Sequence, residues 1–444
     1  MQLLLVALIS RAGLAIASAC DSTTITSQDD ASDIKACSTI TGDVALSTSV
    51  TGAISLDGIE EIKGGLRSQA SRFCSFSAPQ LRSIDQDLTF HELPNAKDIS
   101  FPQLTSIGGT CDFDSLPSLQ TLNISVLGST GSFHLGSAQN LTSMELQNLH
   151  NVTGSHAAVN ITSVGLSYVN GFNDTTHLDS FVLQDVPKMK IFSVRTAEID
   201  ELQISGSGDL TLTFYTGYYK GVTGPKSIGV LNITGCADFF PFHETTLVNT
   251  LDLYQNNFTA LELDWLQVKD TISIMDNPNL SDIMFLSSIV VPDVASHGPP
   301  NGTEAPQWKE LVIVGNPELD SAKIGFGGWE KSFWYWGVRN LSSLVLTGSQ
   351  LHNAFFDPDD YSGRPLPETD HTYTTAEFTV SSDAIGFNCS YLDTLRSKGL
   401  FQGSYTCQGN TIAAGPVPGS AVRRATSMGT LISVLVAVLC GMGI

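Results

Sequence analysis

The fold is decided by two adjacent stretches of 23 residues: residues 79–101, PQLRSIDQDLTFHELPNAKDISF, and residues 102–124, PQLTSIGGTCDFDSLPSLQTLNI. They align without a gap, and an earlier copy is visible at Ile59, Ile62 and Leu66. Self-similarity at a period of this length is typical of a solenoid, in which each coil covers the apolar face of its neighbours. The aligned pairs are Pro79 with Pro102, Leu81 with Leu104, Ile84 with Ile107, Leu88 with Cys111, Phe90 with Phe113, Leu93 with Leu116, Pro94 with Pro117 and Ile99 with Leu122.

Beyond residue 124 the period loosens, but a kernel with the spacing L-x-x-φ-x-φ, where φ is apolar, returns. The kernels are Leu141-Met144-Leu146, Ile161-Val164-Leu166, Leu178-Phe181-Leu183 and Leu341-Leu344-Leu346. Their alternation is typical of a strand with one buried face. Many kernels end in Gly, Asn or Asn-Pro, and Asn277-Pro278 recurs as Asn316-Pro317; an asparagine in such a turn can bond backbone groups that no sheet ladder reaches. We therefore predict a mainly β protein, a right-handed parallel β-solenoid with one short strand per coil and loops in place of regular helices.

The two ends of the chain carry the signals of a secreted, lipid-anchored protein. Residues 1–19 have the apolar run and small-residue cleavage site of a signal peptide; no basic residue precedes the run, and a buried first element is the alternative. The apolar tail 431–444 is shorter than the roughly 20 residues of a spanning helix. Gly419, Ser420 and Ala421 lie one short spacer before it, as in a glycosylphosphatidylinositol (GPI) signal. We expect the lipid on Gly419 or Ser420 and removal of residues 422–444; a tail anchor or single span is the alternative.

Composition also favours an extracellular chain. The formal net charge is −22 at pH 7, and it becomes −25 without the signal peptide and tail, which excludes nucleic acid as a plausible partner. Charged residues make up only 15%, which argues against disorder and coiled coils. Eleven N-x-S/T sequons, several times more than chance, predict dense N-glycosylation. They are Asn123, Asn140, Asn151, Asn160, Asn173, Asn232, Asn257, Asn279, Asn301, Asn340 and Asn388.

The cysteines bracket the body of the protein. We predict the disulfides Cys20–Cys37 and Cys389–Cys407, which would staple the two ends of a solenoid. Cys440 leaves with the tail, so Cys74, Cys111 and Cys236 cannot all pair with one another, and the sequence does not say which stays free. The predicted segments are 1–19 signal peptide, 20–58 N-terminal cap, 59–385 solenoid, 386–409 C-terminal cap, 410–421 linker with the anchor site, and 422–444 anchor signal.

Together these features resemble the fungal GPI-anchored cell-wall-organisation proteins, including the sporulation-specific members. The resemblance covers nearly the whole mature chain and is carried by residues 37–44 (CSTITGDV), residues 101–109 (FPQLTSIGG), the paired-Asn turns, the late Cys pair and the anchor signal. That family is similar in fold to receptor L domains, which are leucine-rich solenoids. The resemblance implies a non-enzymatic role in building or maintaining the cell wall. The coils at 205–245 and 285–310 are irregular, and the stalk before the anchor is short.

A search for catalytic chemistry in the sequence finds no motif. Acidic pairs occur at Asp29-Asp30, Glu60-Glu61 and Asp359-Asp360, but neighbours on a strand point to opposite faces, so we interpret them as solvated turns. The nine His have no metal-ligand spacing, and the motifs of metalloproteases, redox proteins, nucleophile elbows and phosphate loops are absent. We expect no enzyme activity, no cofactor and no metal, although a cleft could be assembled from distant coils.

An aromatic cluster between residues 329 and 336 holds three of the five Trp: Trp329, Trp334 and Trp336. Such rings could stack on sugars of the wall, whereas core packing in an irregular coil is the interpretation that we favour. The leading functional hypothesis is a structural or organising wall protein on the outer face of the plasma membrane or in the cell wall, with wall polysaccharide as a possible partner. The alternatives are a glycan- or protein-binding adhesin or receptor, and a wall-remodelling carbohydrate enzyme.

Overall fold

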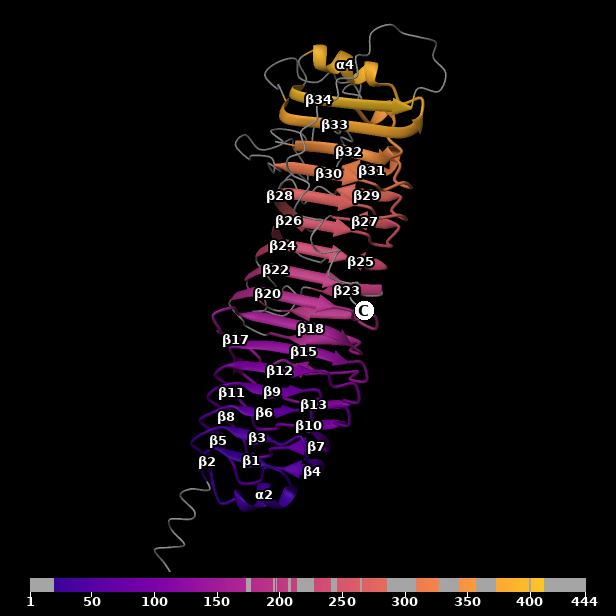
Figure 1. Ribbon diagram of the computed structural model, residues 1–444. Helices are drawn as coiled ribbons and strands as arrows, with labels where there is room; N and C mark the ends of the chain where they lie inside the picture. Colours follow the sequence, from indigo (N-terminus) through magenta and orange to yellow (C-terminus); the bar gives the residue numbers. More distant parts are fainter. Residues whose placement is uncertain are drawn as a thin grey trace, which may run out of the picture. The chain divides into compact units, whose positions relative to one another are not determined.

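The computed structural model describes residues 20–172, 177–194, 196, 198–206, 209–213, 227–240, 246–263, 266–285, 309–326, 343–356, 373–398 and 401–410. The chain divides into two units, residues 1–410 and 411–444, and all described residues belong to the first. This unit is a parallel β-solenoid, as predicted. Figure 1 shows its coils stacked in sequence order from β1 to β34.

One long sheet runs through the whole stack and takes one strand from each of 16 successive coils. All of its pairings are parallel, because every coil brings the chain back to the same wall in the same direction. Its strands are β1 (Thr23–Ile25), β3 (Val44–Leu46), β6 (Leu66–Gln69), β9 (Leu88–His91), β12 (Thr110–Asp114), β15 (Ser132–Ala138), β18 (Ala158–Val164), β20 (His177–Gln184), β22 (Glu198–Ser205), β24 (Ser227–Thr234), β26 (Thr246–Tyr254), β28 (Leu266–Met275), β30 (Glu310–Val314), β32 (Ser343–Ser349), β33 (Tyr373–Ile385) and β34 (Phe401–Asn410).

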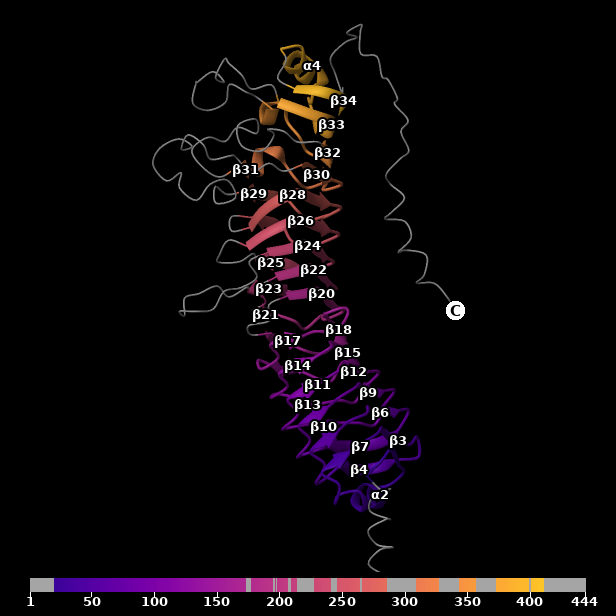
Figure 2. The same ribbon diagram turned by 90° about the vertical axis from the view of Figure 1, so that its left-hand side faces the viewer.

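Four smaller sheets form the other walls of the stack (Figure 2). Two of them belong to the first coils: β2 (Thr39–Ile40), β5 (Glu61–Ile62), β8 (Ser83–Ile84), β11 (Ser106–Ile107), β14 (Ser129–Thr130) and β17 (Asn151–Val152); and β4 (Thr51–Ser55), β7 (Arg72–Ser77), β10 (Asp98–Ser100) and β13 (Thr121–Asn123). Later coils carry β16 (Glu145–Leu146), β19 (Tyr168–Gly171), β21 (Ile191–Val194), β23 (Asp209–Thr213) and β25 (Asp238–Phe240), and then β27 (Ala260–Glu262), β29 (Asp282–Phe285) and β31 (Ile324–Phe326).

The prediction of one strand per coil is therefore wrong. Early coils contain three strands and many later ones contain two, because each coil turns an apolar residue inward on more than one wall. The coil of residues 79–101, for example, buries Ile84, Leu88 and Ile99 on three different sheets. The described helical segments are short: α2 (Gln28–Asp33), η2 (Ser321–Lys323), η3 (Asn353–Phe356) and α4 (Cys389–Ser397).

The register of the stack confirms the 23-residue alignment and its earlier copy. Aligned residues lie directly opposite each other in adjacent coils, so their side chains form columns inside the solenoid. The observed pairs are Ile62 with Ile84, Leu66 with Leu88, Ile84 with Ile107, Leu88 with Cys111, Phe90 with Phe113 and Ile99 with Leu122.

The later kernels do not all share one register. Their common spacing would place Ile161 opposite Leu178, but the structure pairs Ile161 with Leu183. The kernel at 161–166 is therefore not the counterpart of the kernel at 178–183. It has the same spacing because Val164, at the end of β18, and Leu166, beyond that end, are also buried.

Aromatic side chains fill the core of the first coils. Phe73, Phe76, Phe90, Phe101 and Phe113 are buried, and neighbouring ring centroids lie 5.0–6.0 Å apart in tilted or edge-to-face contacts. Such contacts stabilise the folded state by more than the burial of apolar surface alone contributes. The rings thus join successive coils through side-chain packing as well as through backbone hydrogen bonds.

A column of residues with left-handed backbone conformation forms the corner that follows the long sheet. Each has φ between 50° and 70°, and at several of them the backbone N–H donates to a carbonyl of the next coil, as that of Asp185 does to Ser205 at 3.0 Å. The left-handed region costs a residue with a Cβ about 1–2 kcal/mol, so the surrounding ladder must impose this sharp corner. The residues are Ala70, Glu92, Ser115, Ser137, Ser163, Asp185, Gly206, Gly235, Gln255, Asp276, Gly315 and Gly348.

Just beyond this corner, three buried asparagines form a ladder. The side-chain oxygen of Asn277 accepts the Asn256 N–H at 2.9 Å, and that of Asn316 accepts the Asn277 N–H at 3.0 Å. Their amide groups donate to strand carbonyls, for example Asn256 to Ile233 at 2.9 Å. The Asn-Pro turns therefore satisfy backbone groups between coils, as predicted.

Both ends of the stack carry a helix and a disulfide. Cys20–Cys37 encloses α2, which begins with a capping box between Ser27 and Asp30. At the other end, Cys389 in the first turn of α4 is bonded to Cys407 of β34. Both predicted disulfides are confirmed: the first lies within the N-terminal cap, and the second joins α4 to the last strand of the long sheet.

Candidate functional site

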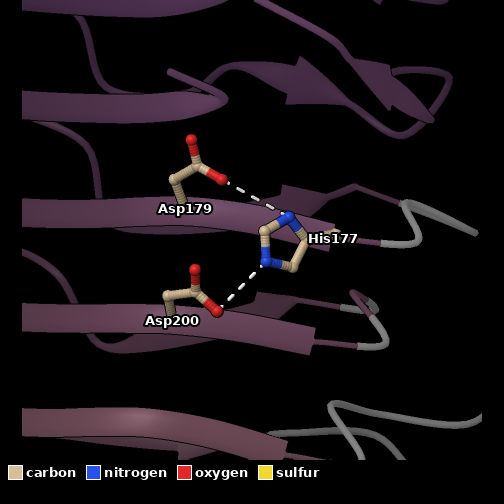
Figure 3. Close-up of side chains that lie close together, drawn as sticks. All are labelled: His177, Asp179 and Asp200. Carbon is tan, nitrogen blue, oxygen red and sulfur yellow. Dashed lines mark hydrogen bonds and ion pairs between the residues drawn. The ribbon is translucent and has the colours of Figure 1, made fainter. Parts of the chain in front are cut away.

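The described residues contain one group whose donor atoms have the spacing of a metal site: His177 and Asp179 on β20, and Asp200 on β22. Figure 3 shows the imidazole between the two carboxylates. His177 Nε2 lies 3.0 Å from Asp200 Oδ1, and His177 Nδ1 lies 3.4 Å from Asp179 Oδ1. The three side chains are 41%, 40% and 67% exposed, respectively, so the group is open to solvent.

The register of β20 and β22 brings these side chains together. His177 pairs with Glu198 and Ser180 with Glu201, and between these pairs Asp179 and Asp200 occupy equivalent positions in adjacent coils. Two successive residues of each strand are solvent-facing at this point, which interrupts the strict alternation of the sheet. Asp179 is also held from the preceding coil, because the Ala157 N–H donates to its Oδ2 at 3.1 Å.

The local charge is strongly negative. Two carboxylates flank the ring of His177, and exposed Glu198 and Glu201 lie on the same strand as Asp200. With both nitrogens protonated, the imidazolium can donate to both aspartates. With one nitrogen unprotonated, imidazole and carboxylate oxygens form a ligand set that suits Zn²⁺.

Three other histidines in the described part of the chain also face an aspartate of a neighbouring coil. His91 Nε2 lies 2.9 Å from Asp112 Oδ2, and the remaining pairs are His134 with Asp114 and His352 with Asp320. Each of these ion pairs involves one carboxylate, whereas that of His177 involves two.

The sequence pattern did not predict this group. The spacing His177-x-Asp179 is too common to be a signal, and Asp200 is 23 residues from His177. The coil between β20 and β22 is 21 residues long, because His177 pairs with Glu198, and Asp200 lies two positions beyond the residue opposite His177. The contact between His177 and Asp200 could be predicted only from the register of the irregular coils. The alignment of the kernels gives a wrong register there, as the pairing of Ile161 with Leu183 shows.

The acidic pairs that the sequence singled out have structural contacts. Asp30 completes the capping box of α2, and the hydrogen bonds from Thr26 hold the pKa of its carboxyl below the usual value. Glu61 pairs with Lys63, and Glu60 lies 4.0 Å from Arg82. Asp359 and Asp360 lie outside the described residues, as do Trp329, Trp334, Trp336 and the anchor candidates Gly419 and Ser420.

Eight of the predicted glycosylation sites are described. Asn140, Asn151, Asn257, Asn279 and Asn388 are exposed, and Asn123, Asn160 and Asn232 are partly buried. The hydroxyl of the sequon bonds the asparagine oxygen at Asn123, Asn232 and Asn388, which leaves the glycan-accepting nitrogen out of that contact. Asn173, Asn301 and Asn340 lie outside the described residues.

The cysteines outside the caps occupy different surroundings. Cys74 is an exposed free thiol on β7, and Cys111 is a buried free thiol on β12. Cys236 is buried, and its thiol lies 3.8 Å from the Thr234 carbonyl oxygen.

The relatives found by comparison with known proteins include two fungal proteins. One is a cell-surface GPI-anchored protein of Arthroderma benhamiae, 38% identical over 86 residues that cover 19% of this chain and 22% of the relative. The other is protein ecm33 of Aspergillus fumigatus, 28% identical over 253 residues that cover 54% of this chain and 57% of the relative. Both are fungal proteins, and the chain is similar to them over these parts of its length.

These relatives confirm the resemblance to the cell-wall-organisation proteins and the predicted location at the outer face of the plasma membrane and the wall. The chain spans less than two thirds of the length of either relative. No protein-family model matches it, and no solved structure is significantly similar. None of the helices in the described part of the chain has the length and hydrophobicity needed to cross a membrane.

Proposed function

We propose that this protein is a non-enzymatic, GPI-anchored glycoprotein that contributes to the organisation and integrity of the fungal cell wall. The observation that carries the proposal is the relationship to a GPI-anchored surface protein and to ecm33. In this proposal Gly419 or Ser420 carries the lipid, and wall polysaccharide is a partner of the exposed faces.

The architecture supports a structural role. The long parallel sheet has sixteen strands, its two ends are capped, and aromatic side chains pack in the first coils. Each coil is therefore held by its neighbours. The leucine-rich, receptor L-domain-like character of the coils is part of the proposal, and the buried ladder of Asn256, Asn277 and Asn316 supports it. Such a body can space or present glycans without chemistry of its own.

The role in the wall is tested by deletion of the protein in its host fungus. We expect increased sensitivity to wall-binding dyes and release of wall glycan, both restored by the wild-type chain. A chain with Gly419 and Ser420 both replaced by lysine should be secreted without lipid and should restore neither. A deletion strain with unchanged dye sensitivity and unchanged wall composition would contradict the proposal.

The absence of enzyme activity and the anchor are tested on the purified protein. Incubation with β-glucan, chitin or mannan should release no new reducing ends; turnover that is lost when one Asp or Glu is replaced would identify an enzyme. Phospholipase should release the protein from membranes, and its last peptide should end at residue 419 or 420. Recovery of residues 422–444 on the mature protein would instead indicate a tail anchor.

A further inference from the structure

Two aspartates are stacked in adjacent coils beside His177. Asp179 and Asp200 occupy equivalent positions of β20 and β22, and adjacent strands of a sheet lie about 4.8 Å apart. Like charges on neighbouring strands destabilise a sheet, and Glu198 and Glu201 add further negative charge on β22. A divalent cation between the two carboxylates would offset this repulsion.

The donor atoms fit a transition metal. His177, Asp179 and Asp200 each offer one ligand atom, and these atoms all lie within 4.8 Å of one another. In tetrahedral zinc sites with bonds of about 2.0–2.2 Å, neighbouring ligand atoms are roughly 3.4 Å apart. An imidazole binds a given ion through one nitrogen. His177 Nε2 lies 3.0 Å from Asp200 Oδ1, close to that value, whereas Asp179 faces Nδ1 at 3.4 Å and its partly exposed side chain must turn toward the ion.

We propose that His177, Asp179 and Asp200 form a surface site for a divalent transition-metal ion of the Zn²⁺ type, with water completing the coordination. The site goes beyond the proposed role in the wall, since it binds a metal whatever that role is. Its ligands come from two coils, so the ion ties β20 to β22. The bond from the Ala157 N–H to Asp179 holds one ligand in place from a third coil.

The other inter-coil histidines provide a matched control. His352 faces Asp320 at 3.4 Å, and its side chain is 46% exposed, similar to the 41% of His177. Both are partly exposed imidazoles beside a carboxylate of another coil. His352 has one carboxylate in its described ion pair rather than two, so its replacement tests for the loss of an ordinary surface ion pair.

The experiment is a calorimetric titration of Zn²⁺ into the purified full-length protein and three variants. Wild type and His352→Gln should bind one zinc equivalent more than His177→Gln, and Asp200→Asn should weaken that site at least about tenfold. Ca²⁺ should not compete, because it prefers oxygen ligands. Equal zinc binding by wild type and His177→Gln, or the same loss in His352→Gln, would overturn the site.

A second measurement needs no variant. Diethylpyrocarbonate modifies accessible imidazoles, and mass spectrometry quantifies the modification of each His-containing peptide. Saturating Zn²⁺ should reduce the modification of His177 several-fold and leave that of His352 unchanged. If zinc protects neither residue, or both equally, the site does not bind the metal.

Discussion

At the scale of single residues, Asp252 carries a charge that opposes folding. It lies in the middle of β26, and partial burial raises the pKa of its carboxyl above the ordinary value of 3.8 despite a hydrogen bond with Ser273. Because the folded state then holds the proton more tightly than the unfolded chain, stability falls as pH rises above 3.8 through the folded pKa.

We therefore expect Asp252→Asn to stabilise the protein at pH 7. The amide keeps a hydrogen-bonding group beside Ser273 and removes the charge. Thermal unfolding should give a higher Tm for the variant at pH 7, and the difference should shrink as the pH approaches 4. A variant with a lower Tm at pH 7 would show that the carboxylate makes a favourable contact that burial does not reveal.

The thiols should differ in reactivity. Cys111 is fully buried, and burial, together with the nearby charge of Asp112, raises the pKa of its thiol far above the usual value. The thiolate is the reactive form, so a buried thiol of this kind is inert. An alkylating reagent should modify Cys74 in the native protein and Cys111 only in denaturant, as peptide mass spectrometry would show; native labelling of Cys111 would place it at the surface.

The left-handed corner shows what single residues in a sequence do not reveal. Eight of the twelve positions hold a residue with a Cβ, including Ala70, Glu92 and Gln255, and only four hold Gly. No residue type marks the corner, because the ladder on both sides imposes the conformation. Its position follows from the strand register, which the sequence gives reliably only between about residues 59 and 124.

At the scale of secondary-structure elements, regular coils were predictable and irregular ones were not. Between Leu66, Leu88 and Cys111 the spacing of paired residues is 22 and then 23, so a gap-free alignment finds the register. Between Ile272 of β28 and Leu311 of β30 it is 39. A longer loop costs little, because closure entropy grows slowly with length, so insertions leave the ladder intact while they erase the period from the sequence.

A charge in one of these columns should break the stack. Ile107 of β11 is 2% exposed and pairs with Ile84, so Ile107→Asp would bury a carboxylate without a partner. We expect a loss of more than about 3 kcal/mol, beyond most single substitutions, and retention of the chain inside the cell. Ser106→Asp, on the neighbouring and partly exposed position, should be secreted normally; secretion of both variants at wild-type levels would contradict the assigned register.

The C-terminal cap should depend on its disulfide. Cys389 and Cys407 are 18 residues apart and join α4 to the last strand of the long sheet. Replacing both with serine should lower the free energy of unfolding by about 2–4 kcal/mol, because the unfolded chain is no longer constrained. Denaturant unfolding measures the change, with Cys74→Ser as the control outside the caps. An unchanged midpoint would mean that α4 packs on β34 firmly enough without the bond.

At the scale of the whole stack, contacts between coils decide what the sequence can show. The stapled ends were predictable because each Cys pair is local. The His177 group was not, because its members meet only through the register of two irregular coils. The structure can thus be predicted from the sequence where contacts between coils repeat at a regular spacing, and it cannot where those contacts depend on loop length.

The sequons divide the stack into two parts. The first five strands of the long sheet, β1 to β12, precede the first sequon at Asn123. All eleven sequons lie between residues 123 and 388, and those in the described part of the chain occur on several walls of the solenoid. N-glycans would therefore screen the later coils and leave the first coils open for contact with other molecules of the wall.

This distribution predicts a measurable pattern of modification. Peptide-N-glycosidase converts each glycosylated asparagine to aspartate, which mass spectrometry detects at single sites. We expect conversion at the exposed sequons Asn140, Asn151, Asn257 and Asn279, because a glycan on an exposed side chain extends into solvent. Replacing these four asparagines with glutamine should leave the fold intact, since exposed positions tolerate substitution within about 0.5 kcal/mol, and should reduce the mass by four glycans. If the enzyme converts none of the four in the secreted protein, the later coils are bare, and the distinction between an open and a screened part of the stack does not hold.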